Sequence, residues 1–336
     1  MAPPVAPEGP LVAIDGLSVA FDGVPALRGV SLHVSRGEAL GLVGESGSGK
    51  SVTWLAALGL LPKSAQVAGR ARLEGRDMLG ASHDALGSVR GGRIAMIFQD
   101  PSSALNPVLT IRRQIGESLA LHRGLSGAAI EAEARRLLDL VGIPDAARRL
   151  SAHPHEFSGG QNQRVMIAIA LAGSPDLLVA DDPTTALDAT IQSQILDLLG
   201  RLRRETGMAL VLISHDLGVV AETCDRVAVM YAGRIVEEGP ADALFADPRH
   251  PYTQGLIGAL PPIDGPRRRL IAVPGSVPDP RAFGGGCAFA PRCPLALDAC
   301  RAVAPALREA GEARRSACLR DEAAHWTAAA FSWAAE

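Results

Sequence analysis

The sequence has no run of apolar residues long enough to cross a membrane. The longest runs, VMIAIALA at 165–172 and MALVLI at 208–213, fall well short of the roughly 20 residues that a transmembrane helix needs. The first ten residues, MAPPVAPEGP, contain no Lys or Arg and no apolar centre, which is unlike a secretory signal. We therefore expect a cytosolic chain that takes part in membrane processes only through a partner.

The sequence also lacks an excess of basic residues over acidic ones. The chain has 33 Lys and Arg against 36 Asp and Glu, and its net charge of −3 predicts no affinity for nucleic acid or for anionic lipid. The one dense basic stretch, Arg267–Arg269, lies among prolines and is typical of a solvated linker. No internal repeat is visible. What remains is an ordinary globular composition, 47% hydrophobic, in a chain of 336 residues that is long enough for two domains.

Short apolar runs alternate with helical patterns along the chain. Near the start, 11–21 and 30–34 are expected to be strands of an antiparallel edge sheet, and 38–44 is a buried strand followed by a helix over 50–61. The pattern turns helical from Thr110 to Leu171. The later strands are expected at 93–100, 176–182, 208–216 and 226–239. Strand, helix and strand in alternation predict an α/β fold with a parallel core and a helical insertion.

A glycine-rich segment follows the buried strand. GESGSGKS at 44–51 matches the phosphate-loop pattern G-x-x-x-x-G-K-[ST] and lies between a predicted strand and a predicted helix, the context that this motif requires. Glycines let the backbone wrap closely around phosphates, and the N–H groups at the helix start point at them. The candidate residues are Gly44, Glu45, Ser46, Gly47, Ser48, Gly49, Lys50 and Ser51. Lys50 is expected to reach the β- and γ-phosphates and Ser51 to bind Mg²⁺.

Two further segments fit a nucleotide hydrolase. Asp181 ends an apolar strand, where such an enzyme needs a carboxylate for Mg²⁺ or its water ligands. Ser158, Gly159, Gly160 and Gln161 open a strong helix, whose N–H groups and positive dipole end form a second anion site. One nucleotide does not need two phosphate cradles in one chain. We therefore expect a dimer in which the second cradle of each chain caps the γ-phosphate bound by the other.

With these motifs in order, the chain resembles the ATPase subunits of ABC transporters. FSGGQ at 157–161 is similar to the family signature, and Gln99 in IFQDP to the glutamine that contacts a Mg²⁺-bound water and the membrane subunit. Asp188 ends TALD, which resembles the family's D-loop, and His215 in LISHD resembles its switch histidine. Phe21 lies where the family keeps an aromatic side chain to stack on adenine. The resemblance implies ATP and Mg²⁺ as cofactors and covers about residues 11–240.

Four more stretches resemble the branch that serves dipeptide and oligopeptide importers, as do PGSVPDP and GCAFAPRCP near the C-terminus. The four are QDPSSALNP, HPHEFSGGQ, DPTTALD and HPYTQGL. This implies an ABC ATPase domain over 1–240, with a helical insertion at about 100–172, and a peptide-importer extension over 241–336. Asn162 departs from the branch, which commonly has a basic residue there.

The resemblance also implies a set of partners and a location. The partners are a second ATPase subunit, taken to be a paralogue, two membrane permease subunits and an extracytoplasmic solute-binding protein. The chain is then peripheral, on the cytoplasmic face of the cell membrane. The imported solute is expected to be a peptide, with nickel complexes or glutathione as alternatives. A soluble ABC ATPase of DNA repair or translation is disfavoured, because the chain has neither a long coiled-coil insertion nor a second cassette.

The identity of residue 182, an Asp, leaves a second function as an alternative. Most ABC ATPases have Glu at this position, as the base that orients the attacking water, and Asp is one methylene shorter. We therefore expect slow hydrolysis at this chain's own site, and a regulatory subunit with weak hydrolysis is the alternative.

Four cysteines gather near the C-terminus in the pattern C-x5-C-x6-C-x17-C: Cys287, Cys293, Cys300 and Cys318. A structural zinc site usually contains tight C-x2–4-C pairs, which are lacking here, while cysteine-only ligation also suits an iron–sulfur cluster. The spacing resembles the extension of peptide-importer ATPases, which implies a [4Fe–4S] cluster. Zinc and unligated thiols remain alternatives. Cys224 stands apart and is expected to be a small buried residue.

Overall fold

The computed structural model describes residues 9–185, 187–260 and 273–320, which form two compact units interleaved along the chain. Within these ranges, the helical unit comprises 9–12, 34–39, 76–185 and 187–213, and the phosphate-loop unit comprises 13–33, 40–75, 214–260 and 273–320. Because the chain passes between the units several times, they do not coincide with the domains expected from the sequence. The boundary at residue 240 stays a prediction. Arg267–Arg269 lie outside the described residues.

Three parallel strands form the centre of the helical unit. They are β6 (Ile94–Ile97), β7 (Leu177–Asp181) and β8 (Ala209–Ile213), in the order β6-β7-β8. Every residue of β7 and β8 is buried, as continuous apolar runs in a parallel sheet require. The parallel core expected from the strand–helix alternation is confirmed.

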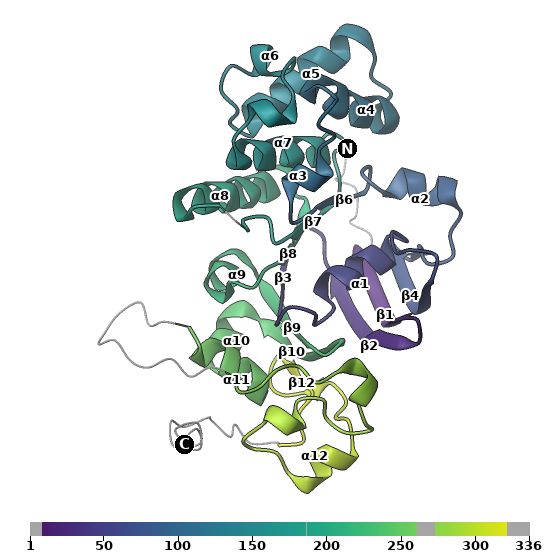
Figure 1. Cartoon of the computed structure of the whole chain (residues 1–336), viewed down its shortest axis with the longest axis vertical. Coiled ribbons are helices and arrows are strands. Elements are labelled where there is room, and N and C mark those ends of the chain that lie inside the picture. Colours follow the sequence, from purple (N-terminus) through teal and green to yellow (C-terminus); the bar gives the residue numbers. More distant parts are fainter. Residues whose placement is uncertain (1–8, 186, 261–272, 321–336) are drawn as a thin grey trace, which may run out of the picture. The chain divides into compact units, whose positions relative to one another are not determined.

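Helices fill the rest of this unit (Figure 1). The longer ones are α2 (His83–Val89), α4 (Ile111–Arg123), α5 (Gly127–Leu140), α7 (Gly159–Leu171) and α8 (Ala189–Thr206). The short ones are α3 (Pro101–Ala104), α6 (Ala146–Arg149) and the 3-10 turn η1 (Pro154–Glu156). Helices α4, α5 and α7 pack against one another, and α7 contacts β6. The helical pattern expected from Thr110 to Leu171 is therefore confirmed.

The phosphate-loop unit begins with a small sheet. Strands β1 (Val12–Phe21) and β2 (Val24–Val34) are joined by Asp22 and Gly23, which have φ of 49° and 78°. A two-residue turn with both residues left-handed produces a tight antiparallel hairpin. Strand β4 (Ala65–Leu73) follows β1 in the sheet and is packed against α1 (Lys50–Ala57), and β5 (Arg76–Asp77) comes next in the chain. The expected antiparallel edge sheet is thus present.

The remaining strands of this unit carry the C-terminal segment. Strand β3 (Ala39–Val43) pairs in parallel with β9 (Arg226–Tyr231), and β10 (Arg234–Pro240) is antiparallel to β9. Strand β12 (Arg315–Ser316) pairs with β10, and β11 (Arg308–Glu309) with β12. The remaining elements are α9 (Leu217–Thr223), α10 (Ala241–Ala246), α11 (Pro251–Gly258), η2 (Pro280–Ala282), η3 (Ala290–Arg292) and α12 (Asp298–Ala302). None of the helices in the described ranges has the length and apolarity to cross a membrane.

Candidate functional site

The phosphate loop connects β3 to α1 in the phosphate-loop unit, as the motif requires. Its three glycines, Gly44, Gly47 and Gly49, have φ of 147°, 78° and 102°, a region that other residues rarely adopt. A Cβ at Gly44 would lie 2.2 Å from the carbonyl oxygen of Met230, so a side chain there is also excluded by contact. The glycines therefore allow both the turn and its close approach to β9.

The inside of the loop is polar and suits phosphate. Helix α1 starts at Lys50 without a side-chain cap, and the buried Ser48 hydroxyl has no hydrogen-bond partner among the residues that the structure describes. The Lys50 Nζ donates to the carbonyl oxygens of Gly44, at 2.7 Å, and Glu45, at 3.1 Å. Half-buried Ser51 and exposed Ser46 complete the loop. Backbone N–H groups, an ammonium and a hydroxyl form a donor set that fits a polyphosphate chelated to Mg²⁺.

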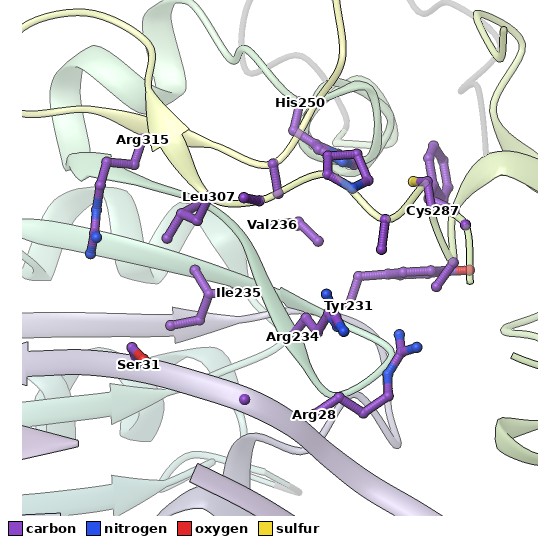
Figure 2. A pocket seen from close by; sticks show the side chains of 18 residues that line it. Arg28, Ser31, Tyr231, Arg234, Ile235, Val236, His250, Cys287, Leu307 and Arg315 are labelled. Atoms are coloured by element: carbon purple, nitrogen blue, oxygen red, sulfur yellow. The ribbon is translucent and has the colours of Figure 1, made fainter. Parts of the chain in front are cut away.

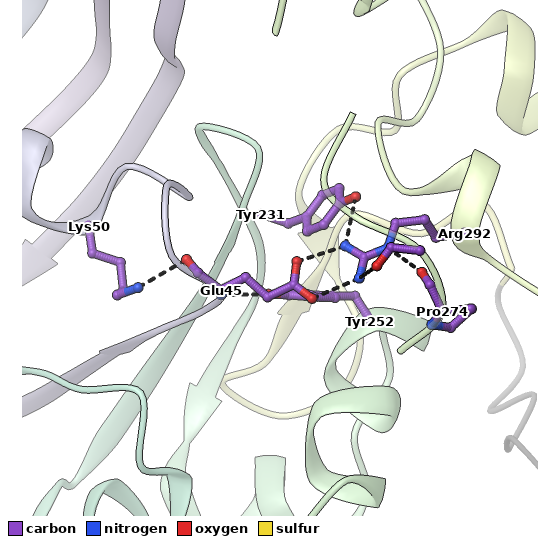
Figure 3. Close-up of polar contacts among 7 residues, drawn as sticks. Glu45, Lys50, Tyr231, Tyr252, Pro274 and Arg292 are labelled. Atoms are coloured by element: carbon purple, nitrogen blue, oxygen red, sulfur yellow. Dashed lines mark hydrogen bonds and ion pairs between the residues drawn. The ribbon is translucent and has the colours of Figure 1, made fainter. Parts of the chain in front are cut away.

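Two residues that lie outside the predicted nucleotide-binding motifs contact this loop. Tyr252 of α11 accepts a hydrogen bond from the Glu45 N–H at 2.8 Å, and Arg292 of η3 forms an ion pair with the Glu45 carboxylate (Figure 3). Both lie in stretches that resemble the peptide-importer branch, HPYTQGL and GCAFAPRCP. The branch motifs could thus have marked Tyr252 and Arg292 as functional residues. The sequence did not indicate that these residues contact the phosphate loop.

Phe21 and His215 belong to the same unit. Phe21 is the last residue of β1 and is half-buried. His215 is exposed and lies between Ser214 and Asp216, where the Ser214 hydroxyl accepts the Asp216 N–H at 3.0 Å. Asp216 in turn caps α9 by accepting the N–H groups of Gly218 and Val219. This short network holds the backbone on which His215 is presented.

The two adjacent acids, Asp181 and Asp182, lie in the helical unit. Asp181 is the last residue of β7 and is buried, whereas Asp182 is half-buried and has left-handed backbone with φ of 45°. The strand expected over 176–182 therefore ends one residue early, at Asp181, and Asp182 does not continue it. The direction of the Asp182 side chain is set by the turn, which is closed by a hydrogen bond from the Thr185 N–H to the Asp182 carbonyl at 3.2 Å.

Gln99 follows β6, the strand that pairs with β7. The register places Ile97 beside Ala180, so the segments after the two parallel strands leave the sheet at the same edge. Gln99 is exposed there. Strand pairing within the unit therefore brings Gln99 and Asp181 to the same edge of the sheet.

Ser158 begins the signature helix α7. Its hydroxyl accepts the Gln161 N–H at 3.3 Å, and the Gln161 side chain accepts the Ser158 N–H at 3.1 Å, a capping box. These two N–H groups are thus already paired, and Gly159 and Gly160 supply the other N–H groups at the helix start. Asn162, which departs from the branch, donates to the Pro154 carbonyl at 3.0 Å and so ties the helix to η1.

Asp188 begins the next helix in this unit. Its carboxylate accepts the Ile191 N–H at 3.0 Å and caps α8. A Cβ at Gly160 would lie 2.8 Å from Ile191, so the starts of α7 and α8 pack closely where the glycine stands. The helical unit therefore brings the signature and the D-loop side by side.

The predicted nucleotide residues are divided between the two units. Phe21, residues 44–51 and His215 lie in the phosphate-loop unit; Gln99, residues 158–161, Asp181, Asp182 and Asp188 lie in the helical unit. The roles assigned to them from the sequence remain proposals.

The four C-terminal cysteines line one small cavity of about 20 Å³ in the phosphate-loop unit. A cavity of this volume admits about one water molecule. Burial raises the pKa of the Cys293 thiol to about 12 and also raises the pKa of the Cys287 and Cys318 thiols. The shared lining supplies four cysteine donors, the right kind for a cysteine-only metal site, although the raised pKa values oppose the thiolate form that binds metal. The donors do not stand ready at ligand distances, because no group of three or more His, Cys, Asp or Glu in the described ranges is arranged to hold a metal ion.

Cys224 is separate from this group, as expected. It is buried, and a Cβ at Gly41 would lie 3.2 Å from its sulfur, so it packs as a small side chain against β3.

A larger cavity, of about 340 Å³, lies beside the cysteines between β2, β10 and the C-terminal segment (Figure 2). It is lined by Arg28, Arg234 and Arg315 and by no carboxylate, and Cys287 borders both cavities. Burial, together with the Arg234 cation, lowers the pKa of Arg28 to about 10. None of residues 44–51 lines it, so this hollow is separate from the phosphate loop.

Comparison with known proteins agrees with the two parts of the sequence resemblance. A family model described as ABC transporter matches residues 27–185, and one described as oligopeptide/dipeptide transporter, C-terminal region, matches residues 236–300. A Brucella abortus protein named as a peptide import ATP-binding protein is 51% identical over 314 residues, which cover 92% of this chain and 94% of that protein.

A further relative and a solved structure support the same family. The oligopeptide transport ATP-binding protein OppD of Mycobacterium tuberculosis is 49% identical over 319 residues, 93% of this chain. The chain spans about half, 52%, of the length of that protein. A solved dimeric structure of the ATP-binding cassette MJ0796 bound to ADP and Pi matches with a TM-score of 0.61 and 30% identity, over 68% of this chain and 98% of that one. The chain therefore belongs to the ABC transporter ATP-binding family, in the branch with the oligopeptide/dipeptide transporter C-terminal region.

Proposed function

We propose that this chain binds and hydrolyses ATP to power peptide uptake by a membrane ABC importer. The observation that carries the proposal is the loop between β3 and α1, with three left-handed glycines, an uncapped helix start and a buried Ser48 hydroxyl without a partner in the described part of the chain. Such a loop suits the phosphates of a nucleotide. The names of the relatives, which refer to peptide import and oligopeptide transport, support the substrate class.

The proposed residue roles follow the family resemblance. Lys50 faces the β- and γ-phosphates, and Phe21 stacks on adenine. Ser51, Gln99 and Asp181 serve Mg²⁺ directly or through water, and this ion neutralises charge that develops on the phosphates. Asp182 orients the attacking water, and His215 acts beside the γ-phosphate.

Residues 158–161 and Asp188 are proposed to act across a dimer. Gly159 and Gly160 supply backbone N–H groups at the start of α7, an arrangement that suits a γ-phosphate held by a second ATPase subunit. We propose a paralogue as that subunit, because a short Asp182 favours division of labour between two unlike sites. The same residue favours the second candidate function, a regulatory nucleotide-binding subunit with weak hydrolysis.

The helical unit is proposed to dock on a membrane permease subunit. Phe98, Val108 and Leu121 are large apolar side chains that are 42%, 77% and 75% exposed. Phe98 directly precedes Gln99, Val108 lies shortly before α4, and Leu121 lies in the last turn of α4. Apolar side chains in such exposed positions are suited to burial by a partner. Two permease subunits and an extracytoplasmic solute-binding protein complete the proposed importer, which places the chain at the cytoplasmic face of the cell membrane.

Lys50→Ala tests the nucleotide site, with Lys63→Ala as its matched control. Lys63 is exposed and lies outside the loop. In equilibrium binding of ATP to the full-length chain, Lys50→Ala should weaken binding by at least about tenfold, because it removes the cation that faces the phosphates. Lys63→Ala should leave the affinity unchanged. Equal affinity of the Lys50→Ala and wild-type chains would contradict the proposed site.

The cysteines are proposed to bind a [4Fe–4S] cluster, with zinc as the competing occupant. Support comes from the shared cavity, from cysteine as the sole donor type and from the resemblance to the importer extension. Ligation requires the four sulfurs to be brought to ligand distances, because no such group in the described residues is arranged to hold a metal ion. When bound, the metal centre would pin the C-terminal segment to the rest of its unit.

Metal analysis of anaerobically purified protein tests this part. We expect about four irons and four sulfides per chain. Ser at Cys287, Cys293, Cys300 or Cys318 should abolish the brown absorbance, and Cys224→Ser should retain it. Stoichiometric zinc without iron would rule out the cluster and support the competing occupant.

A further inference from the structure

All three guanidinium nitrogens of Arg292, in the phosphate-loop unit, donate hydrogen bonds (Figure 3). Its side chain is only 5% exposed. The two terminal nitrogens donate to the two Glu45 carboxylate oxygens at 2.7 and 2.8 Å, and Nε donates to the Pro274 carbonyl at 2.7 Å. Longer bonds of 3.3 Å reach the Tyr231 hydroxyl and the Gly275 carbonyl. A buried guanidinium with paired bonds to a carboxylate is a well-fixed group.

Its partner, Glu45, is the second residue of the phosphate loop. All three of its polar groups are engaged: the N–H donates to Tyr252, the carbonyl accepts from Lys50, and the carboxylate accepts from Arg292. Tyr252 and Arg292 both come from the region after residue 240. The position of the loop at Glu45 is therefore set from outside the loop.

Aromatic packing braces this contact. The Tyr231 ring lies 4.6 Å from that of Tyr252 and 5.3 Å from that of Phe289, between centroids. All three side chains are at most 1% exposed. Phe289 is the residue before η3, so the turn that carries Arg292 is anchored in the same buried cluster. Arg292 consequently cannot leave Glu45 without disturbing packed rings.

The charge of Glu45 matters for a loop that holds phosphates. A carboxylate in this position repels the negative charges of a triphosphate, and a repulsion of this kind is strong where water is partly excluded. A guanidinium paired with both oxygens cancels that charge.

We propose that Arg292 is a positioning residue of the ATP site, which fixes Glu45 and masks its charge. The C-terminal extension is then a working part of the phosphate loop and not an appendage. This inference rests on the proposed binding of ATP at residues 44–51.

The test is ATP binding to full-length chains that carry Arg292→Gln, Glu45→Gln or both. Arg292→Gln should weaken ATP binding by about tenfold, because it unmasks the carboxylate. The penalty should be smaller for ADP, which carries less charge, and should shrink in high salt, which screens the repulsion. Glu45→Gln alone gives the reference affinity for the double variant, in which it should restore most of the affinity that Arg292→Gln loses.

Arg281→Gln is the matched control, since Arg281 belongs to the same segment and its side chain is 75% exposed. It should bind ATP like the wild type. If Arg292→Gln does not fold, Arg292→Lys keeps the charge but loses the paired bonds, and we expect a loss of about threefold that salt does not change.

Three results would overturn the inference. The first is wild-type ATP affinity in Arg292→Gln. The second is wild-type ATP affinity in Arg292→Lys, where that variant replaces Arg292→Gln. The third is a loss of affinity in Arg292→Gln that Glu45→Gln does not restore. The last would mean that Arg292 serves only the fold. A wild-type chain that binds no ATP would instead overturn the proposed function, and the inference with it.

Discussion

Asp182 combines a short side chain with a left-handed backbone. At φ of 45°, a non-glycine residue is under mild strain, and Asp tolerates this region better than most. The Asp182 N–H donates to the Ile213 carbonyl at 2.9 Å, which fixes the turn in place. The backbone is thus held, and the reach of the carboxylate depends on the side chain itself. A catalytic group that is misplaced by about 1 Å can lose ~10²-fold in rate.

Asp182→Glu and Asp182→Asn, made in the assembled transporter, test this at the level of ATP turnover. If Asp182 falls short, Glu should raise turnover by about tenfold or more, and Asn should cause little further loss. Thermal stability of both variants is the control, because Glu is less suited to the left-handed turn. A collapse with Asn together with no gain from Glu would show that Asp182 is already a competent base.

Helices α4 and α5 are joined by an ion-pair network around Glu133. The Glu133 carboxylate accepts two bonds of 2.8 Å from Arg136 on its own helix and a further bond from Arg123 at the end of α4. Its side chain is 15% exposed. Hydrogen bonds from Arg136 and then Arg123 lower the pKa of Glu133 to about 2, against the opposing effect of burial.

Glu133→Gln should therefore lower the free energy of unfolding at neutral pH by about 1–3 kcal/mol. A carboxyl with a depressed pKa stabilises the fold above its unfolded pKa, and this contribution is lost as the pH falls through the folded value. The difference between the two chains should accordingly be full at pH 7 and should shrink between about pH 4.5 and pH 2.

Urea unfolding followed by helical circular dichroism measures this difference. Glu131→Gln is the control, since Glu131 lies on the same helix with its side chain 63% exposed and should change stability by less than about 0.5 kcal/mol. A constant difference between the Glu133→Gln and wild-type chains from pH 7 to pH 3 would contradict the network.

The sequence predicted elements well where the pattern was apolar and continuous. Strands β3, β7 and β8 and the helix α5 lie within the ranges expected from their hydrophobic runs. Strand β4 was missed because most of its residues are exposed and offer no alternation. The run at 226–239 was expected as strand throughout, but Ala232 and Gly233, with φ of 48° and 75°, turn it into the hairpin of β9 and β10. Turn geometry, not hydrophobicity, decided that element.

Prediction of the candidate site from the sequence was also limited to features set by local patterns. Motif spacing alone located residues 44–51 and 158–161 at the starts of α1 and α7. The contact between Glu45 and Arg292 joins residues 247 apart, and no local pattern in a single sequence encodes such a pair. The four cysteines were predicted as a group by their number and spacing, but their common cavity depends on the fold of the segment that carries them.

At the scale of the whole chain, the C-terminal segment is built into the phosphate-loop unit. Strand β12 extends the sheet beside β10, and the buried Glu237 carboxylate of β10 accepts the N–H groups of Arg249 and His250. Glu238 pairs with Arg315 of β12. These contacts tie the region that resembles the importer extension to the sheet that also contains β3, the strand before the phosphate loop.

The central claim is that ATP bound by this chain drives peptide uptake. The most direct measurement uses the complex that co-purifies with the chain from its native membrane, reconstituted into vesicles, and follows ATP-dependent uptake of labelled peptide. The account predicts a multi-span membrane protein in the complex, uptake in wild type and in Lys63→Ala, and none in Lys50→Ala, although that complex assembles. Undiminished uptake with Lys50→Ala, or a chain recovered without any membrane partner, would contradict it.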